Sequence, residues 1–407
     1  MPTLAMPAYP AAAVDDLEEP YRRYRYLLQE LPFSEDPKTG SAALHRHADV
    51  LAALKHPDLI MSSVLEPAMN LPKALQPVVS PATRMLSRMM LFTDAPDHTR
   101  LRGLANRAFT PRAVEGMRAR VRQIADELLD RLEGTGPVDV INGYANWLPI
   151  VVIAEMLGAP LANQRQIKVW SDEFALLISS SGQPALVVAA RGLRGVFFLT
   201  RFMRRLVRRK RANPGDSLLD AMIAAEESGD VLTEQELVSN AMLLLAAGHI
   251  TTTNLIGNGL LALLRHPEQL ELLRNNPDLM PGAVEEFLRY ESPLQYTGRV
   301  ASKDVEINGH RIQAGRALAL GLAAANRDPY QFPDPNRLDI RRTENRHLAF
   351  AGGAHFCLGA ALARLEGQIA IGAILERFPD LRLAETGVEW RNAGVVRGLK
   401  RLPVFLR

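Results

Sequence analysis

The stretch Phe350–Gly359 reads FAGGAHFCLG, and its cysteine, Cys357, is the only one among the 407 residues. A single thiol cannot form an internal disulfide, and it lacks the partner cysteines that a structural zinc site or an iron–sulfur cluster requires. Three roles remain for Cys357. It can be a nucleophile, an axial metal ligand, or an inert thiol buried as a small apolar side chain.

The residues around this cysteine favour ligation over the other two roles. Gly352, Gly353 and Gly359 weaken any packed element, so their clustering indicates a sharp turn or a close approach of the backbone to a flat ligand. The apolar spacing over Leu358–Leu375 predicts a helix that begins just after the cysteine, where free amides and the helix dipole favour a thiolate. His355 lies only two residues away, which is a poor position for the base that a nucleophile needs.

The segment resembles the haem-binding loop of the cytochrome P450 superfamily, Phe-Gly-x-Gly-x-His-x-Cys-x-Gly. The resemblance implies that Cys357 is the proximal ligand of haem b and that Phe350 and Gly359 belong to the cofactor-binding loop. It also implies that His355 helps to hold a haem propionate. An anionic sulfur ligand pushes electron density onto the iron and favours breaking the O–O bond of bound dioxygen. Ala351 replaces the family's usual glycine, so we expect the start of the loop to be slightly repositioned.

A second motif lies in the long apolar stretch Glu234–Leu264, which predicts a helix. Gly248 costs about 1 kcal/mol in a helix interior, and the three threonines that follow it closely are poor helix formers. The motif is either an incidental kink or an opening for dioxygen and water. It resembles the family's oxygen-binding groove, Ala-Gly-x-Asp/Glu-Thr-Thr, in which the Thr251 hydroxyl helps to protonate bound oxygen. The catalytic residues implied by this resemblance are Ala247, Gly248, Ile250, Thr251 and Thr252.

Ile250 stands where the family has an acid. A carboxylate at this position assists proton delivery to the distal oxygen, and an isoleucine side chain cannot carry protons. We therefore expect protons to arrive through Thr251 or Thr252, through ordered water, through His249, or through hydroxyl groups of the substrate. Oxygen activation should be slower, or more dependent on the substrate, than in a relative that has the acid.

The third motif is the segment Glu285–Arg289, which reads EEFLR. Glu286 and Arg289 are three residues apart, and as an exposed pair they would stabilise a helix by only about 0.2–0.5 kcal/mol. Their apolar neighbours indicate instead a partly buried turn, where an unpaired charge is costly. The segment resembles the family's Glu-x-x-Arg motif, and the resemblance implies that Arg337 completes a structural Glu-Arg-Arg triad behind the haem.

Donors for the haem propionates are expected from separate parts of the chain. The segment Asp94–Arg102, DAPDHTRLR, resembles the family's Asp-x-Pro-x-His-x-x-x-Arg segment. His98 and Arg102 are four residues apart, so they share a helix face and can reach one anion. Such a pair on a helix is more often simply solvated. The resemblance adds Arg299, as the family's strand arginine, and His355 to a propionate-binding set.

The remaining sequence predicts a mainly α fold with a small β region, which is the cytochrome P450 fold that the resemblance implies. Hydrophobic residues make up 47% of the chain, enough to bury a large core and a cofactor. Because no linker or repeat is present, we expect residues 1–407 to form a single haem domain with 1–20 loosely ordered. Alternation around Asn308-Gly309 predicts a hairpin over 305–312, and 317–322 predicts another strand. Helical spacing also covers Leu51–Lys55, Pro111–Leu132, Val140–Leu157, Leu161–Leu177, Ala189–Arg211, Ser217–Glu227, Pro267–Asn275 and Met280–Tyr290.

The charge pattern limits the partners of the chain. A net charge of +3 is too small to indicate a nucleic acid partner. The run Arg201–Arg211 is basic, and we expect it on the solvated face of an amphipathic helix, with contact to a membrane surface or a partner protein as alternatives. The acidic start of the chain predicts neither a signal peptide nor a membrane anchor. An unpaired thiol suits a cytoplasmic location.

The substrate is expected to be of medium size and lipophilic, for example a polyketide, a macrolide or a terpenoid. This expectation comes from the family resemblance and from methionine-rich pocket segments, which form adaptable apolar walls. Gln295 and Tyr296 are the expected polar anchors. The pocket residues implied by family position are Met89, Leu243, Leu244, Leu294, Gln295, Tyr296 and Val395.

The sequence favours a soluble haem-thiolate monooxygenase of the bacterial type, which hydroxylates or epoxidises its substrate with O2. The chain contains no flavin or iron–sulfur module, so electrons are expected from a separate ferredoxin or flavodoxin. A peroxide-driven or otherwise atypical enzyme, suggested by Ile250, and a non-catalytic haem binder or sensor remain as alternatives. The basic residues expected to receive an acidic redox partner are Arg100, Arg107, Arg346 and Arg364.

Overall fold

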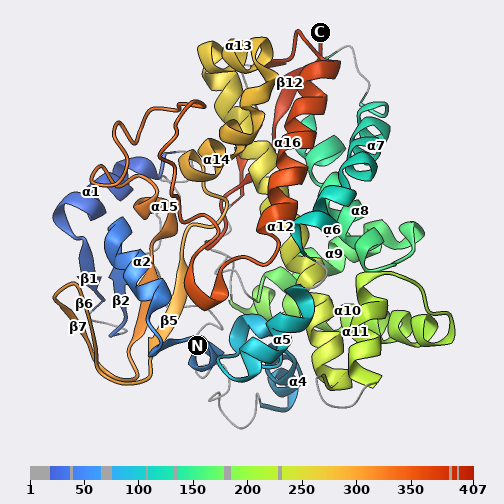
Figure 1. Cartoon of the computed structure of the whole chain (residues 1–407), viewed down its shortest axis with the longest axis vertical. Helices are drawn as coiled ribbons and strands as arrows, with labels where there is room; N and C mark the ends of the chain where they lie inside the picture. Colours follow the sequence, from blue (N-terminus) through green and yellow to red (C-terminus); the bar gives the residue numbers. More distant parts are fainter. Residues whose placement is uncertain are drawn as a thin grey trace.

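The computed structural model describes residues 19–36, 40–65, 76–106, 109–132, 136–177, 185–227, 232–384, 387–391 and 394–407. The loosely ordered segment expected over 1–20 lies almost entirely outside these residues. Figure 1 shows a helix-rich body beside a smaller region that contains the strands of the largest sheet. The fold prediction, mainly α with a small β region, is confirmed.

Most of the chain that the structure describes is helical. Their bounds are α1 (Tyr21–Glu30), α2 (His47–Lys55), α4 (Gln76–Leu86), α5 (Asp97–Asn106), α6 (Pro111–Gly116), α7 (Arg118–Leu129), α8 (Trp147–Met156), α9 (Gln164–Ala175), α10 (Ala185–Ala212), α11 (Leu218–Glu227), α12 (Glu234–Arg265), α13 (Pro267–Asn275), α14 (Met280–Tyr290), α15 (Leu322–Ala325) and α16 (Ala360–Arg377). Short turns of 3-10 or π helix are η2 (Ser62–Leu65), η3 (Met90–Phe92), η4 (Ile141–Ala145), η5 (Leu161–Asn163), η6 (Pro277–Leu279) and η7 (Gly353–His355).

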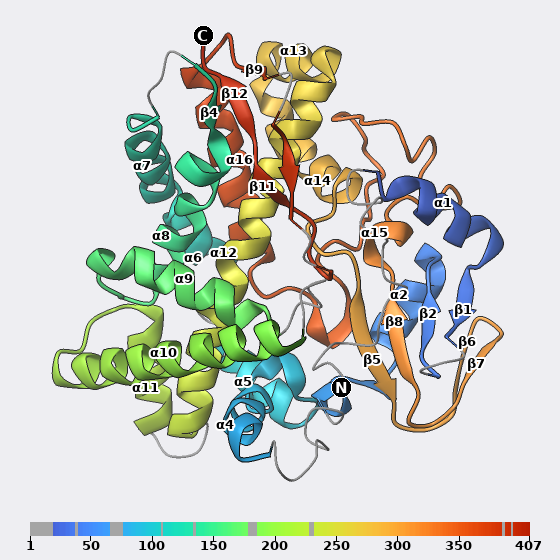
Figure 2. The same cartoon turned by 180° about the vertical axis from the view of Figure 1, so that it is seen from behind.

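Helix α12 runs through the middle of the helical body (Figures 1 and 2). It begins with a capping box, in which Thr233 accepts from the backbone of Glu236 while the Glu236 carboxylate accepts from the backbone of Thr233. It packs against α8, α16, α10, α14 and α9. Nearly every side chain over 237–263 is buried. The central helix is therefore held on several sides, and it is a rigid support for any site that lies along it.

The largest sheet has the strand order β1-β2-β8-β5-β3. β2 and β8 pair in parallel, with Ala42 opposite Leu318, and the other neighbours are antiparallel. β5 places Arg299 opposite Leu318 of β8, and β3 pairs with the other edge of β5 at Val300 and Ala301. The strand bounds are β1 (Phe33–Glu35), β2 (Ala42–Leu44), β3 (Leu59–Ile60), β5 (Thr297–Ala301) and β8 (Ala317–Leu320).

The smaller sheets include the predicted hairpin. Asn308 and Gly309 both have positive φ, 48° and 87°, as the tight turn of a two-residue hairpin requires. The other small sheets have the orders β4-β12-β9 and β10-β11. The bounds are β4 (Val138–Asp139), β6 (Val305–Ile307), β7 (His310–Ile312), β9 (Arg382–Leu383), β10 (Glu389–Trp390), β11 (Leu399–Arg401) and β12 (Pro403–Phe405).

Most predicted helices are present, with small differences at their ends. The predicted helix over 111–132 is divided at Met117 into α6 and α7, and the one over 140–157 begins with the π-helical turn η4. Helices α1, α4 and α15 were not predicted, and α15 begins at Leu322, the last residue of the strand predicted over 317–322. α1 is rich in arginine and tyrosine and buries only Tyr24, Leu27 and Leu28, and α4 contains Pro81, which usually interrupts a helix.

Candidate functional site: a recessed thiol ringed by cations

Cys357 lies between η7 and α16, in a loop that holds its backbone in place. Its N–H donates to the carbonyl of Phe350 at 3.0 Å. The side chain is accessible to solvent. Even so, the surrounding protein desolvates the sulfur, and this raises the pKa of the Cys357 thiol, while the N–H of Gly359 and the charges of Arg102 and Arg364 act in the opposite direction. The sulfur thus lies in a recess, with donors and cations placed to stabilise a thiolate.

Two residues of the loop have the left-handed backbone that glycine adopts most easily. Gly353 has φ 66°, and a Cβ added there would lie 2.2 Å from the carbonyl oxygen of Leu54, so only glycine fits. Ala351 has φ 57°. The glycine expected at position 351 from the family pattern therefore has a physical reason, and alanine keeps the same conformation at a steric cost.

The loop is supported from behind by a charged cluster. The Arg364 guanidinium lies 4.6 Å from the centre of the Phe350 ring and donates from Nε to Glu285 at 2.7 Å. His347 also bonds to Glu285, at 3.1 Å. Burial alone would raise the pKa of the Glu285 carboxyl, but the bonds from Arg364 and His347 outweigh it and lower the pKa to about 2. Glu285 is therefore ionised, and it fixes Arg364 beneath the loop.

Four cationic or potentially cationic side chains meet on one side of this recess. The rings of His98 and His355 are 4.1 Å apart. Arg102 donates to the carbonyl of Phe356 and influences the Cys357 sulfur electrostatically. Burial, followed by the nearby His355, Arg102 and Arg299 charges, lowers the pKa of His98 to about 4. The predicted propionate-binding residues are thus brought together by α5, β5 and η7.

Arg299 shows most clearly that this cluster is built for an anion. Its side chain is 2% exposed, and its Nη1 donates to the carbonyl of Gly298 at 2.7 Å and to the sulfur of Met61 at 2.9 Å. It forms no ion pair with any residue that the structure describes, and burial lowers its pKa to about 10. A buried guanidinium without a carboxylate partner is costly unless a ligand supplies the negative charge.

The carboxylate near these cations, Asp94, was quoted in the sequence motif but not assigned a role. It accepts from the backbone N–H groups of Met61 and Ser62 at 2.8–3.1 Å and lies 3.8 Å from the His355 ring nitrogen. Although burial opposes ionisation, these bonds hold the pKa of Asp94 well below its usual range. Asp94 ties the segment after β3 to the cation cluster, and it leaves the positive charge of the cluster in excess.

The middle of α12 carries an exposed face. Ala247 is exposed, and Gly248, Ile250 and Thr251 are half-buried, although the helix on both sides of them is buried. The Thr251 hydroxyl donates to the carbonyl of Ala247 at 3.1 Å. The predicted kink does not interrupt the helix, which is continuous from Glu234 to Arg265. The exposure of small side chains in the middle of a buried helix indicates a space kept clear for a ligand.

Two of the proton routes expected without an acid at position 250 are not supported by the geometry. His249 lies on the opposite side of α12 from Thr251, where its Nε2 lies 3.2 Å from Asp172 on α9. Its ring is buried there, so it ties α12 to α9 and does not face the recess. Thr252 is buried, and its hydroxyl donates to the carbonyl of Gly248 at 3.1 Å. Thr251 and water remain the candidates within the recess.

The predicted Glu-Arg-Arg triad has a different third member. Glu286 and Arg289 are fully buried and form two parallel bonds of 2.8 Å. The second arginine on Glu286 is Arg342, whose Nε lies 3.2 Å from the carboxylate. Arg337 is exposed and contributes only its backbone carbonyl, which accepts from Arg289 at 3.1 Å. The prediction of Arg337 was wrong, because the chain turns between 333 and 342 and directs the later arginine inward.

The residues predicted to line a substrate pocket are divided between two regions. Met89, Leu243 and Leu244 are buried on or beside α12, whereas Leu294, Gln295 and Tyr296 lie in the segment before β5, next to Val395. The Gln295 amide bonds to the Tyr24 hydroxyl and donates to the carbonyl of Ser292 at 2.6 Å. Its predicted role as a polar anchor for the substrate is therefore not supported, because both ends of the amide already have protein partners.

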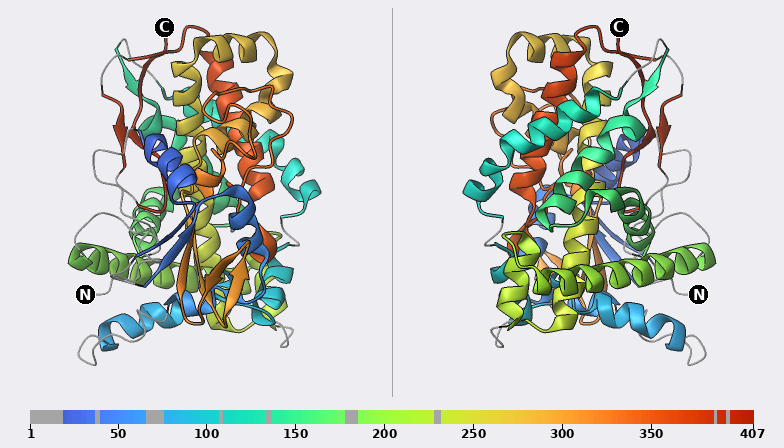
Figure 3. Two further views of the ribbon diagram at one scale, coloured as in Figure 1. Left: turned by 90° about the vertical axis from the view of Figure 1, so that its left-hand side faces the viewer. Right: turned by 90° about the vertical axis from the view of Figure 1, so that its right-hand side faces the viewer.

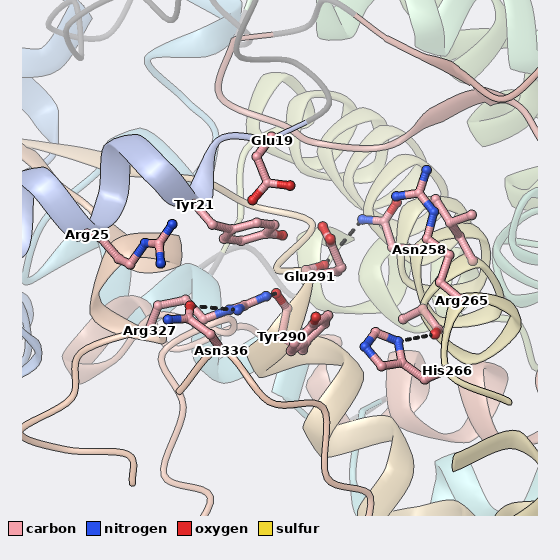
Figure 4. A pocket seen from close by; sticks show the side chains of 12 residues that line it. Glu19, Tyr21, Arg25, Asn258, Arg265, His266, Tyr290, Glu291, Arg327 and Asn336 are labelled. Atoms are coloured by element: carbon pink, nitrogen blue, oxygen red, sulfur yellow. Dashed lines mark hydrogen bonds between the residues drawn. The ribbon is translucent and has the colours of Figure 1, made fainter. Parts of the chain in front are cut away.

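A separate polar hollow of about 290 Å³ lies near the C-terminal end of α12 (Figure 4). Its wall includes Arg327, which is sandwiched between the rings of Tyr21 and Tyr290 at 4.0 and 3.8 Å. Asn258 also lines it and donates to the carbonyls of Glu291 and Arg397. These contacts join α1, α12 and α14 to the loop after α15, so this hollow is a structural junction outside the Cys357 recess.

The residues of the recess fit a planar, metal-containing cofactor with two carboxylates. The thiol would supply a ligand to the metal, the nearby cations would hold the carboxylates, and the small exposed side chains of α12 would leave room for the ring. Iron protoporphyrin has these requirements. Fold and site together define a haem-thiolate protein.

Comparison with known proteins identifies the family. The sequence profile described as Cytochrome P450 matches residues 196–391. The chain is 43% identical to cytochrome P450 CYP107DY1 of Priestia megaterium over 88% of each chain, and 41% identical to the polyketide biosynthesis cytochrome P450 PksS of Bacillus subtilis over 89% of this chain and 88% of that protein. The P450 monooxygenase TamI bound to tirandamycin C has a TM-score of 0.86 at 40% identity, covering 98% and 100% of the chains. The chain belongs to the cytochrome P450 family.

Membership of the family establishes the class of enzyme. P450 enzymes carry haem b with a cysteine thiolate as axial ligand, and this chain is a cytochrome P450 monooxygenase. It uses O2, a lipophilic substrate and a redox partner. Among the helices that the structure describes, none has both the length and the apolar character needed to cross a membrane.

Proposed function

We propose that this P450 inserts oxygen into a mid-sized lipophilic product of secondary metabolism, by hydroxylation or epoxidation, within a single haem domain. Two observations carry the proposal: the accessible Cys357 thiol with cations beside it, and the exposed Ala247–Thr251 face in the middle of the otherwise buried α12. PksS acts in polyketide biosynthesis and TamI binds tirandamycin C, and both names support a polyketide-like substrate. The lone reduced thiol supports a cytoplasmic location.

Each residue of the recess has a proposed task. When bound, haem activates dioxygen and delivers one oxygen atom to the substrate. The N–H of Gly359 and the charges of Arg102 and Arg364 partly offset the burial that raises the pKa of the Cys357 thiol, and they would stabilise the thiolate once the sulfur binds a metal. His98, Arg102, Arg299 and His355 hold the two cofactor carboxylates and fix the orientation of the ring.

On the opposite side, the Thr251 hydroxyl is the group proposed to position water and pass protons. In the structure it donates to the carbonyl of Ala247. A hydroxyl can exchange this helix bond for a bond to water at small cost, because it both donates and accepts. Met89, Leu243 and Leu244 supply an apolar wall that excludes bulk water from the substrate.

The carbon monoxide difference spectrum of the reduced protein tests the central assignment. We expect a Soret band at the position typical of thiolate ligation, and we expect Cys357→Ser to lose this band while still binding haem. Arg299→Leu removes the unpaired buried cation, and we expect it to weaken haem retention by roughly tenfold in transfer to apomyoglobin. A thiolate band that persists in Cys357→Ser would refute the proposed ligand.

A separate ferredoxin or flavodoxin is the proposed electron donor. Of the four arginines expected to receive it, Arg100 pairs with Glu236 and Arg364 with Glu285, and Arg107 lies outside the described residues. Arg346 is exposed and forms no ion pair within the described part of the chain. The KM of the enzyme for an acidic ferredoxin should therefore rise by roughly fivefold in Arg346→Glu. It should be unchanged in the matched control Arg401→Glu. Equal effects of both variants would contradict a docking role for Arg346.

Ile250 supports a second candidate function, peroxide-driven turnover. The residue is half-buried and offers no group that titrates. If proton supply limits this enzyme, Ile250→Glu should raise the ratio of product to released peroxide by about tenfold, whereas the isosteric control Ile250→Gln should not. If both variants leave the ratio unchanged and peroxide alone supports turnover at the rate of the O2-driven reaction, the second function is the better description.

A further inference from the structure

Helix α10 carries nine basic residues and no acidic one. Five of the basic side chains have partners: Arg191 and Arg194 pair with Glu173, Lys210 with Asp220, and Arg211 with Glu226, while Arg209 donates to the carbonyl of Gly158. The others are different. We call Arg201, Arg204, Arg205 and Arg208 the arginine stripe, because their spacing of three and four residues places them on one face.

All four arginines of the stripe are exposed, and they form no ion pair with any residue that the structure describes. The opposite face of the helix, with Leu199, Met203 and Leu206, is buried against the body. Like charges at this spacing repel one another and destabilise an isolated helix. The stripe therefore costs folding stability, and nothing within the described fold offsets it, so an external anion is the natural partner.

The stripe continues into an apolar region towards the start of the helix. Leu186 is 73% exposed and Phe197 is 62% exposed, on the same outer face as the arginines. Phe197 packs edge-on against Phe198, which stacks on Trp170 of α9 at 5.6 Å. The ring of Phe197 is thus supported on one side and presented to solvent on the other. From Leu186 to Arg208 the outer face extends about 33 Å along the helix axis.

The position of α10 leaves this face free. α10 lies on the side of the molecule away from α16, the helix that follows Cys357, and it reaches beyond the neighbouring elements at one end (Figures 2 and 3). It packs on α9, α12, α11 and α4 through its inner face. Contact through the outer face would therefore leave the Cys357 side available to a redox partner.

We propose that the outer face of α10 docks this enzyme on the surface of an anionic lipid bilayer. A bilayer is flat over 33 Å, and it offers phosphates to the arginines and an acyl layer to Leu186 and Phe197 at the same time. Arginine stems reach along such an interface while the guanidinium stays at the phosphates. An acidic protein would match the stripe but would need an additional pocket for the apolar end. The proposal concerns peripheral contact, and it does not depend on the identity of the substrate.

Flotation with defined vesicles tests the proposal on the haem-loaded enzyme. The vesicles contain equal parts of phosphatidylglycerol and phosphatidylcholine, or phosphatidylcholine alone, at about 0.1 M salt, where surface charges still act over about 10 Å. We expect binding to the first vesicles only. Replacing the stripe with R201Q, R204Q, R205Q and R208Q together should weaken binding by a hundredfold or more, because each basic residue at such a surface contributes roughly fivefold. Phe197→Ser alone should weaken it by about tenfold.

A matched variant separates the stripe from net charge. R112Q, R131Q, R341Q and R401Q together remove the same charge from exposed arginines on other elements, and we expect them to change vesicle binding by no more than about threefold. Equal losses in both quadruple variants, or no binding of the unmodified enzyme to the anionic vesicles, would overturn the proposal. If the enzyme ignores vesicles and the stripe variant instead loses affinity for an acidic ferredoxin, the face belongs to a protein partner.

Discussion

At the level of single residues, the structure gives physical reasons for departures from the family pattern. Ala351 adopts the left-handed backbone for which the family uses glycine, and Arg342, not Arg337, reaches the buried Glu286 carboxylate. Neither outcome could be read from composition. A φ angle depends on the path of the whole loop, and the reach of an arginine depends on how the chain before it turns. Both differences lead to predictions.

Replacing Ala351 with glycine should stabilise the enzyme. A non-glycine residue in the left-handed region costs about 1–2 kcal/mol, and glycine loses about 0.5–1 kcal/mol through the added freedom of the unfolded chain. The expected net gain is about 0.5–1 kcal/mol, seen as a higher urea midpoint of the haem-loaded protein. Gly353→Ala is the opposite control, because the added Cβ would meet the Leu54 carbonyl. A lower midpoint for Ala351→Gly would contradict strain at this position.

The corrected triad predicts unequal effects of two neighbouring arginines. Arg342→Gln removes a charged partner from Glu286, which is 0% exposed, and should lower the free energy of unfolding by about 1.5–3 kcal/mol. Arg337→Gln should change it by less than about 0.5 kcal/mol, because that side chain is exposed and only its carbonyl is used. Urea unfolding of both variants, together with the fraction that shows the thiolate carbon monoxide band, measures this. The reverse order would restore Arg337 to the triad.

At the level of elements, helices were the easiest feature to predict, because a periodic apolar pattern needs no knowledge of the partner. α10, α12, α13 and α14 lie within a few residues of their predicted ends. How closely two helices approach was not predictable from pattern alone. The distance between two helices depends on small residues at the point where the helices cross. From the sequence alone, a glycine within a helix indicates only a loss of helix stability. Gly195 in α10 illustrates this.

Gly195→Ala should force α9 and α10 apart. A Cβ at Gly195 would lie 2.5 Å from the backbone nitrogen of Phe174 and 2.7 Å from the carbonyl oxygen of Trp170, and backbone atoms cannot move aside as a side chain can. We expect a loss of about 1–3 kcal/mol in the free energy of unfolding, measured by urea denaturation. Gly116→Ala is the matched control, because its Cβ would meet nothing within 4 Å. If both variants behave alike, close packing at Gly195 is not the cause.

At the level of the whole molecule, the fold brings together motifs that are far apart in the sequence. His98, Arg102, Arg299 and His355 lie near one another beside the Cys357 loop, and their contacts to a cofactor stay predictions. The sheet could not be predicted in the same way, because β2 and β8 pair in parallel across more than 270 residues, and short apolar strands carry no mark of a distant partner. The same long-range packing buries histidines whose burial cannot be predicted from the residues beside them in the sequence. The pH dependence of stability therefore belongs to this scale.

His45 should make the enzyme sensitive to acid. It is 0% exposed beside β2, and burial, followed by the charge of Arg23, lowers its pKa from 6.5 to about 4. Between these values the unfolded chain binds a proton that the folded chain does not, so stability falls as the pH falls from 6.5 towards 4. At pH 4.5 the loss attributable to this group should be about 2 kcal/mol relative to pH 7. Stability at and above pH 7 should be unaffected by this titration.

His45→Gln measures this contribution, because glutamine keeps a polar side chain beside Ser34 but does not titrate. The substitution also changes side-chain contacts at pH 7, so the quantity to compare is the change in unfolding free energy between pH 7 and pH 4.5. We expect this change to be smaller in His45→Gln by about 2 kcal/mol. His98 is unsuitable for the comparison, because it is proposed to hold a cofactor carboxylate. Parallel pH profiles for the unmodified enzyme and His45→Gln would show that the acid sensitivity arises elsewhere.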